Sequence, residues 1–135
     1  MNPISKIGLG TVQFGMPYGI SNKHGQTTEY EVTSILTYAK KIGIDVLDTA
    51  SAYGTSEKIL GKNNLEKFKI VSKFSIHNNE ENLSIQLQQS LKALNIHSLY
   101  GYLSHRPLEV VNYPEQWEEL NNFKEKGFIK KIGFS

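Results

Sequence analysis

The sequence predicts an α/β fold in which strands and helices alternate. Short apolar runs recur along the chain, segments with helical spacing of apolar residues lie between them, and glycines separate the two kinds of segment. The resulting order is β-α-β-α-β-α-β-α-β, which implies parallel strands joined by helical crossovers. Either an open doubly wound sheet or a (β/α)₈ barrel is compatible with this order. Five strands in 135 residues are about half of a ~250-residue barrel.

Five segments are predicted to be strands because they are rich in Ile, Val, Leu and Phe. They are Ile7–Thr11, Ile44–Thr49, Phe68–Phe74, Leu99–Leu103 and Phe128–Phe134. The segment Val12–Gln26 is predicted to be a loop, because it contains a proline and several glycines.

Four segments are predicted to be helices. The first is the best defined, because Thr28 and Glu31 form a capping-box pattern and Gly43 stands where a left-handed residue is expected after the helix. The others are Ser56–Leu60 before Gly61, a helix capped by Asn79 that carries Leu83, Leu87, Leu91 and Leu94, and a helix opened by Pro114 that carries Trp117, Leu120 and Phe123 and ends at Gly127.

The composition is that of a soluble globular domain, with 39% hydrophobic and 21% charged residues. A net charge of +2 without a run of basic residues argues against a nucleic-acid binder. The absence of cysteine excludes disulfides and Cys-zinc sites, and no pair of histidines has metal-ligand spacing, so no metal is expected. No stretch approaches the ~18 apolar residues of a membrane span, and the first residues lack the apolar core of a signal peptide. We therefore expect a cytoplasmic protein without membrane or nucleic-acid partners.

Three histidines, His24, His77 and His97, lie in predicted loops or near element ends and are expected to be solvated. Two glycines near the N-terminus, Gly8 and Gly10, invite comparison with the dinucleotide-binding fingerprint. That fingerprint requires a third glycine where this sequence has Gln13, and a helix where this sequence has a predicted loop. A Rossmann domain is therefore disfavoured, and the two glycines either allow a tight strand or let a cofactor approach the backbone.

Four ionisable side chains lie at or just beyond the carboxyl ends of successive predicted strands. Asp48 and then Tyr53 follow the second strand, Lys73 nearly ends the third, and His105 follows the fourth. Parallel α/β folds build their sites at this end of the sheet. A buried lysine is costly without a partner, and Asp48 is available. We therefore expect the four side chains to converge, with Asp48 and Lys73 in contact.

The chemistry of this set is that of a general acid. Tyr53 is a phenol, which keeps its proton at neutral pH but becomes a stronger acid when an ammonium such as Lys73 lies beside it. Asp48 would keep that ammonium charged and in place, and His105 could donate a hydrogen bond to a substrate oxygen. Such a group can protonate the alkoxide formed when a hydride is delivered to a carbonyl.

The sequence resembles the aldo-keto reductase superfamily from Ile4 to Ser135. The most specific segment is Leu-Asp-Thr-Ala-x-x-Tyr-Gly at Leu47–Gly54, and Lys73 and His105 follow it in the family's order. Further likeness is carried by Gly8–Thr11, Gly43–Val46, Ser56-Glu57, Leu60-Gly61, Ile70–Ser72, Leu103-Ser104, Arg106, Lys126-Gly127 and Ile132–Ser135. The opening segment Gly8–Ile20 looks like a bacterial branch of the family.

The resemblance implies a (β/α)₈ barrel that reduces an aldehyde or ketone to an alcohol and uses NADPH without a Rossmann fold. It implies a catalytic tetrad of Asp48, Tyr53, Lys73 and His105, with Tyr53 as the proton donor. The substrate would be a small carbonyl compound, and nothing in the sequence identifies it.

The resemblance also assigns residues to the cofactor. It implies that Gly10, Thr11 and Asp48 lie near the nicotinamide of NADPH and that Ser135 holds the carboxamide.

Members of the family have about as much chain again after the fifth strand. Residues 1–135 are therefore expected to be the N-terminal half of such a barrel, truncated and inactive by themselves. The alternative is a non-catalytic half-barrel that self-assembles. Because the first and fifth strands would be unpaired edges and the inner side of the sheet is expected to be strongly apolar, we predict a homo-oligomer that forms through these edges.

Overall fold

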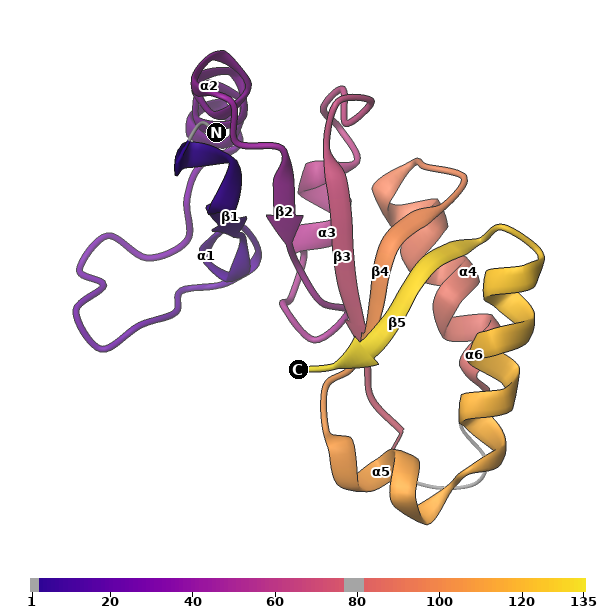
Figure 1. Cartoon of the computed structure of the whole chain (residues 1–135). Helices are drawn as coiled ribbons and strands as arrows, with labels where there is room; N and C mark the ends of the chain where they lie inside the picture. Colours follow the sequence, from indigo (N-terminus) through magenta and orange to yellow (C-terminus); the bar gives the residue numbers. More distant parts are fainter. Residues whose placement is uncertain (1–2, 77–81) are drawn as a thin grey trace.

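The computed structural model describes residues 3–76 and 82–135, which form one parallel sheet with helices packed against it (Figure 1). The strands are β1 (Gly8–Gly10), β2 (Val46–Asp48), β3 (Lys69–Phe74), β4 (Leu99–Ser104) and β5 (Ile129–Phe134). They pair in sequence order, and every neighbouring pair is parallel. The predicted α/β class and all five predicted strands are confirmed.

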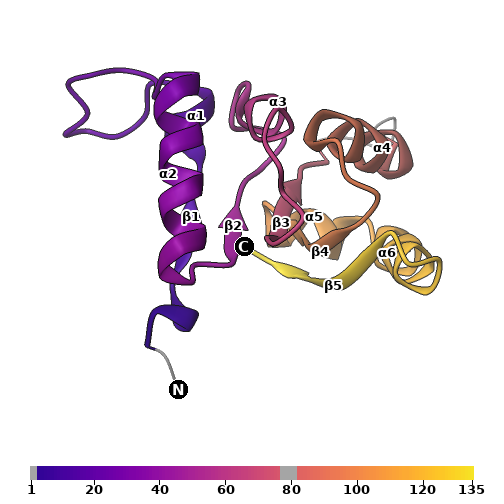
Figure 2. The same ribbon diagram turned by 90° about the horizontal axis from the view of Figure 1, so that it is seen from above.

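The helices follow the strands in the alternating order that the sequence predicts. They are α1 (Val12–Gly15), α2 (Glu29–Ile42), α3 (Ser56–Leu60), α4 (Leu83–Leu94), α5 (Pro107–Asn112) and α6 (Glu115–Glu125), and a 3₁₀ turn at Pro3–Lys6 precedes them. Viewed from above, α2, α3, α4 and α6 lie outside a curved sheet (Figure 2). This is the layout of a barrel wall that is open between β1 and β5.

The first long helix, α2, is confirmed together with its caps. The Thr28 hydroxyl accepts a hydrogen bond from the Glu31 backbone N–H at 3.3 Å, and the Glu31 carboxylate accepts one from the Thr28 N–H at 3.2 Å. Gly43 has a φ of 90°, the left-handed conformation that ends the helix. These caps satisfy backbone groups that the helix itself leaves unpaired.

Other helix boundaries differ from the predictions. The cap of α4 is Asn82, whose side chain accepts from the Ile85 N–H at 3.0 Å, whereas the predicted cap Asn79 lies outside the described residues. Pro114 occupies the N-cap position of α6 rather than its first turn. The short helices α1 and α5 were not predicted, because four and six residues carry little helical periodicity.

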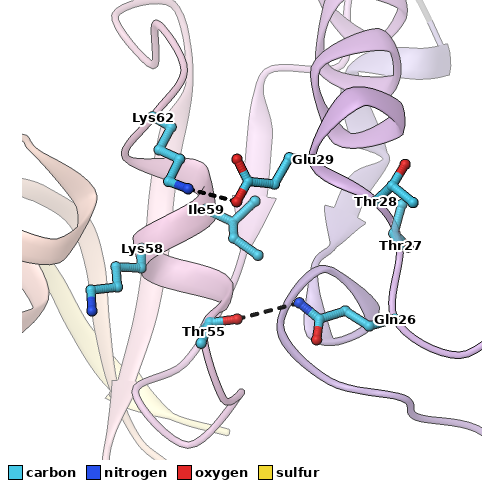
Figure 3. A pocket seen from close by; sticks show the side chains of 8 residues that line it. All are labelled: Gln26, Thr27, Thr28, Glu29, Thr55, Lys58, Ile59 and Lys62. Atoms are coloured by element: carbon cyan, nitrogen blue, oxygen red, sulfur yellow. Dashed lines mark hydrogen bonds and ion pairs between the residues drawn. The ribbon is translucent and has the colours of Figure 1, made fainter.

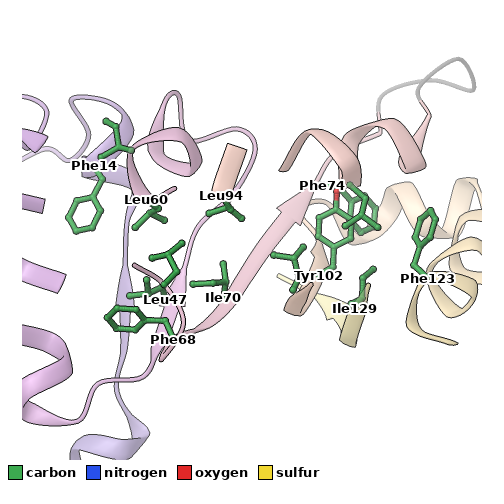
Figure 4. Close-up of a cluster of buried hydrophobic side chains, with 14 of the residues drawn as sticks. Phe14, Leu47, Leu60, Phe68, Ile70, Phe74, Leu94, Tyr102, Phe123 and Ile129 are labelled. Carbon is green, nitrogen blue, oxygen red and sulfur yellow. The ribbon is translucent and has the colours of Figure 1, made fainter. Parts of the chain in front are cut away.

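The core fills the space between the sheet and its helices (Figure 4). The rings of Phe74 on β3 and Tyr102 on β4 pack with centroids 4.9 Å apart. The predicted leucine stripe of α4 supplies Leu83, Leu87 and Leu94 to this core. Burial of each such side chain stabilises the fold by about 1.5–3 kcal/mol, so the strands are held firmly from the helix side.

Trp117, which the sequence places on this last helix, packs on the sheet. The Trp117 ring stacks on Phe134 of β5, with centroids 5.2 Å apart and planes 13° from parallel. This contact joins the last helix to the last strand of the described sheet.

The opposite face of the sheet has a mixed surface. Residues paired in a parallel sheet point to the same side, so the register places Gly10, Asp48 and Val71 together there. A Cβ added at Gly101 would lie 3.3 Å from two Val71 methyl carbons, so that glycine leaves room for the valine. The exposed Lys131, which pairs with Gly101, adds a charge. The prediction of a strongly apolar inner face is therefore wrong, since small and charged residues interrupt the aliphatic ones.

Candidate active site

The four predicted catalytic residues gather at the carboxyl end of the sheet. Asp48 is the last residue of β2, Lys73 is the penultimate residue of β3, and His105 directly follows β4. Tyr53 lies in the turn that leads from β2 into α3. The arrowheads of the strands point to this end, in the lower part of Figure 1 where the chain terminates.

Lys73 is the centre of the cluster. Its ammonium nitrogen donates to Asp48 Oδ1 at 2.6 Å, to the Thr49 carbonyl oxygen at 2.9 Å and to the Tyr53 hydroxyl oxygen at 3.3 Å. The residue is only 4% exposed, and an ammonium has three protons for these three acceptors. The predicted contact between Asp48 and Lys73 is confirmed. The Thr49 carbonyl was not predicted, because a backbone oxygen leaves no signal in the sequence.

The imidazole of His105 stands edge-on to the phenol of Tyr53. Their ring centroids are 5.9 Å apart and their planes meet at 84°. The His105 backbone N–H donates to the Phe74 carbonyl at 2.9 Å, so β3 fixes the start of the loop after β4. The histidine is therefore held beside the tyrosine by the pairing of the two strands.

The pKa of His105 is held below its ordinary value of 6.5. Desolvation of the ring is the largest cause, and the positive charges of Lys73 and Arg106 act in the same direction. The carboxylates of Asp48 and Glu109 oppose the shift without reversing it. The imidazole is therefore neutral at pH 7, with one N–H donor and one acceptor nitrogen.

A tight turn presents Tyr53. Its backbone N–H donates to the Ala50 carbonyl at 3.1 Å, and its own carbonyl accepts from the Ser56 N–H at 3.0 Å. A Cβ added at Gly15 of α1 would overlap the Tyr53 carbonyl oxygen and the Ser56 backbone nitrogen. Gly54 has a φ of 57°, which an L-residue rarely adopts. Only glycine at positions 15 and 54 lets the two backbone segments approach so closely, a requirement that the sequence analysis missed.

The four residues that the resemblance assigns to NADPH differ in what they expose. Gly10 is exposed and a Cβ there would meet no atom within 4 Å, and the Asp48 side chain beside it is 43% exposed. Ser135 is also exposed, and its backbone N–H donates to Ser104 O at 2.9 Å. Thr11 is 0% exposed, and its hydroxyl donates to the Asp48 carbonyl at 2.9 Å. Open backbone beside an exposed carboxylate fits a flat ring, whereas a side-chain contact from Thr11 to a cofactor stays a prediction.

The described residues line one hollow at this site and another beside α2 and α3. One of about 510 Å³ adjoins His105 and is lined by Arg106, Leu108, Glu109 and Tyr113 among others. The other, of about 410 Å³, lies between the start of α2 and α3 (Figure 3). It is bridged by an ion pair of Lys62 with Glu29 at 2.6 Å and includes none of the four predicted catalytic residues.

The remaining sequence predictions concern solvated histidines, metals and membranes. His24 and His97 are exposed as predicted, and His77 lies outside the described residues. Across residues 3–76 and 82–135, no three His, Cys, Asp or Glu side chains gather in a way that could hold a metal ion. In the same part of the chain, no helix has the length and apolar character to cross a membrane.

Comparison with known proteins places this geometry in a family. The chain is 31% identical to Protein REDOX 2 of Catharanthus roseus, over 78% of this chain and 41% of that protein. It is 28% identical to the methylglyoxal reductase DkgA of Salmonella typhimurium, over 76% of this chain and 39% of that protein. It thus spans less than half the length of these curated relatives.

Solved structures give the same picture. An aldo-keto reductase of Pseudomonas aeruginosa is 30% identical, with a TM-score of 0.78 over 95% of this chain and 54% of that chain. An aldo-keto reductase of Klebsiella pneumoniae, 24% identical with a TM-score of 0.72, shares the fold over 94% of this chain and 44% of that chain. The five strands and their helices therefore correspond to about half of a (β/α)₈ barrel, as predicted.

The model of the Aldo/keto reductase family matches residues 6–135, nearly the whole chain. The chain belongs to the aldo/keto reductase family.

Proposed function

We propose that the protein reduces a small aldehyde or ketone to an alcohol with NADPH as the reductant. The observation that carries this proposal is the position of the Lys73 ammonium, 2.6 Å from the Asp48 carboxylate and 3.3 Å from the Tyr53 hydroxyl. In the proposed reaction the Tyr53 phenol is the proton donor. The names of two relatives support the reaction class, since one is a methylglyoxal reductase and a mutant of another, Gox0644 at 25% identity, is crystallised in complex with NADPH.

In the proposed mechanism Tyr53 is the general acid. NADPH, when bound, supplies the hydride that reduces the carbonyl carbon. The Tyr53 hydroxyl donates its proton to the carbonyl oxygen as negative charge develops there, and the Lys73 ammonium stabilises the phenolate that remains. A positioned general acid typically contributes about 10²–10⁴-fold to the rate.

His105 orients the substrate in this mechanism. Its imidazole is neutral because desolvation and nearby cations lower its pKa. One ring N–H can therefore donate a hydrogen bond to the carbonyl oxygen beside the Tyr53 hydroxyl, without adding a second positive charge next to Lys73. Asp48 holds the ammonium in place through its 2.6 Å contact.

We assign the nicotinamide end of the cofactor to the neighbouring strand ends. Gly10 supplies open backbone there, and the half-exposed carboxylate of Asp48 lies beside it. Ser135 presents an exposed polar side chain for the carboxamide. Thr11 lies directly after Gly10, and its hydroxyl and its backbone N–H both donate to Asp48 O, so we assign it the role of fixing the strand ends beside the nicotinamide.

We further propose that residues 1–135 act as the N-terminal half of a barrel and are inactive by themselves. The support is that the chain spans 41% of REDOX 2 and 54% of the Pseudomonas reductase. Turnover would then require further strands and loops that bind the cofactor phosphates. A second candidate function is a non-catalytic half-barrel that self-assembles. The observation that supports it is the pair of open sheet edges at β1 and β5.

A chimera tests the catalytic proposal. Residues 1–135 replace the matching part of the Pseudomonas reductase, and NADPH oxidation is followed with methylglyoxal. We expect turnover in the chimera, none in the 135-residue chain, and a loss of about 100-fold or more in Tyr53→Phe with NADPH affinity unchanged. A folded chimera that binds NADPH equally well but turns over no faster than its Tyr53→Phe variant would contradict the role of Tyr53. Turnover by the 135-residue chain would contradict its inactivity.

We also propose a cytoplasmic location, as the sequence analysis expects. Fractionation of the native host with an antibody against the chain checks it, and recovery from the membrane or an extracytoplasmic fraction would contradict it.

A further inference from the structure

Three buried hydroxyl groups form a continuous relay beneath the tetrad. Thr11, Thr49 and Ser56 are each 0% exposed. The Thr49 hydroxyl donates to Ser56 Oγ at 3.1 Å, the Ser56 hydroxyl donates to the Thr11 carbonyl at 2.9 Å, and the Thr11 hydroxyl donates to the Asp48 carbonyl at 2.9 Å. The Ser56 hydroxyl also lies 2.9 Å from the Thr11 hydroxyl oxygen, so both acceptors of its one proton belong to Thr11. The relay therefore has a single direction, from Thr49 through Ser56 and Thr11 to Asp48.

Both ends of the relay reach a group that holds the Lys73 ammonium. At one end, the Asp48 carbonyl accepts from the Thr11 hydroxyl and also from the Thr11 N–H at 3.0 Å, while the Asp48 carboxylate accepts from Lys73. At the other end, Thr49 donates its hydroxyl to Ser56 and offers its carbonyl to the same ammonium at 2.9 Å. The relay thus ties together two of the three acceptors of Lys73.

Ser56, in the middle of the relay, also holds the third acceptor. Its backbone N–H donates to the Tyr53 carbonyl at 3.0 Å and closes the turn that presents the phenol. The contact between Lys73 Nζ and the Tyr53 hydroxyl is the longest of the three, at 3.3 Å. Because a hydrogen bond of this length is near the limit of useful geometry, a small shift of Thr49, Asp48 or the turn would break it.

We propose that this relay is a positioning device that sets the Lys73 ammonium against the Tyr53 hydroxyl, with Ser56 as its central residue. None of the three hydroxyls is open to solvent, so they act through Asp48, Thr49 and Tyr53 rather than on a substrate. The catalytic role of the relay rests on the proposed function, whereas its effect on the position of the Lys73 ammonium does not.

The test reads the ammonium directly by ¹⁵N NMR of the lysine side chains in the 135-residue chain, with Lys73→Met to assign the signal. The buried, triply bonded Lys73 ammonium is expected to exchange its protons slowly. Thr49→Val removes a hydroxyl while keeping the side-chain shape, and Ser56→Ala removes the central one. Both are expected to shift the Lys73 signal and to speed proton exchange about tenfold, as the loss of one hydrogen bond implies.

Two controls separate positioning from general loosening. Thr49→Ser keeps the hydroxyl and is expected to retain the wild-type signal. Ser90→Ala makes the same change as Ser56→Ala at another fully buried serine, outside the relay, and is expected to leave Lys73 unchanged. The amide spectrum of each variant shows whether it has folded.

An unchanged Lys73 signal in folded Thr49→Val and Ser56→Ala would overturn the proposal, whatever the chimera does in turnover. If Ser56→Ala does not fold, the Lys73 signal of the isosteric variant Thr49→Val tests the proposal. Failure of both to fold would overturn the proposal as well, because the relay would then be a requirement for stability rather than a positioning device.

Discussion

Lys73 shows why a lysine can be buried in this fold and how far a sequence can predict that. The cost of removing an ammonium from water predicted a partner, and Asp48 is that partner at 2.6 Å. The Thr49 carbonyl and the relay beneath it were not predictable, since every residue has a carbonyl and serine and threonine occur throughout the chain. At the residue scale, charge pairing was predictable and neutral hydrogen bonding was not.

Replacement of Asp48 by Asn tests the ion pair through stability. The change leaves a buried ammonium without its carboxylate, and because Asp48 is itself half-exposed we expect a loss of about 2 kcal/mol in the free energy of unfolding. The matched control is Asp45→Asn, whose partner Lys69 lies at the same 2.6 Å but is 49% exposed, so its loss should be clearly smaller than that of Asp48→Asn. Urea unfolding measures both changes in unfolding free energy. Equal losses would mean that burial of Lys73 does not strengthen its ion pair.

His105 should make stability depend on pH in a defined direction. Its folded pKa is below 6.5, so the unfolded chain binds more protons as the solution is acidified. The neutral His105 contributes to stability above pH 6.5, and this contribution is lost as the pH falls through the pKa of the folded state. His105→Gln should therefore weaken the drop in unfolding free energy between about pH 8 and about pH 5. The exposed His97→Gln is the control, and an identical pH profile for wild type and His105→Gln would contradict the expected effect.

At the scale of elements, the long helices were predictable and the short ones were not. The cap signals of α2, Thr28 and Gly43, lie in the sequence itself. The single turn of α1 exists only because Phe14 is buried in the core and Gly15 packs on the Tyr53 turn. So short a helix is not stable without tertiary contacts, and those contacts join positions too distant in the sequence to appear as a pattern.

Gly15 is a sharp test of that packing between α1 and the turn before α3. An added Cβ would overlap the Tyr53 carbonyl oxygen, so Gly15→Ala must displace the turn and should cost about 1–3 kcal/mol of unfolding free energy. Gly10→Ala is the control, because a Cβ there meets no atom within 4 Å. Thermal unfolding compares the two, and a Gly15→Ala variant as stable as Gly10→Ala would contradict the close approach.

Glu57 joins α3 to β3 and should give a pH dependence opposite to that of His105. Its carboxylate accepts from the buried Ser72 hydroxyl at 2.6 Å, and burial raises its pKa above the ordinary 4.5. The folded chain therefore binds more protons than the unfolded one. The stability that Glu57 contributes is fully present below pH 4.5 and is lost as the pH rises through the raised pKa.

Glu57→Gln keeps an oxygen acceptor for Ser72 and removes the titration. We expect this variant to be more stable than wild type at neutral pH, with the difference vanishing as the solution is acidified. Urea unfolding across the acid range measures it, and the exposed Glu66→Gln serves as control. A variant less stable than wild type at neutral pH would show that the buried carboxylate is stabilising as a charge.

At the scale of the whole molecule, the half-barrel has two open edges and a face without helices. β1 and β5 each pair on one side only within the described sheet, so each leaves a row of backbone groups unpaired. The uncovered face carries glycines, Asp48 and Lys131 as well as aliphatic residues, so hydrophobic burial there is weaker than the sequence suggested. Any self-association should therefore depend more on strand pairing at the edges than on the inner face.

We predict that the 135-residue chain self-associates through these edges. β5 is the better candidate, because it is six residues long whereas β1 has three. Light scattering over micromolar to millimolar concentrations should show a mass that rises from 15.3 kDa toward twice that value. The chimera with the Pseudomonas reductase is the control, since strands supplied by that enzyme would pair with both edges and remove this route of association. A 15.3 kDa monomer with a cooperative melt at every concentration would contradict the prediction, because two unpaired parallel edges would then be stable in water without a partner.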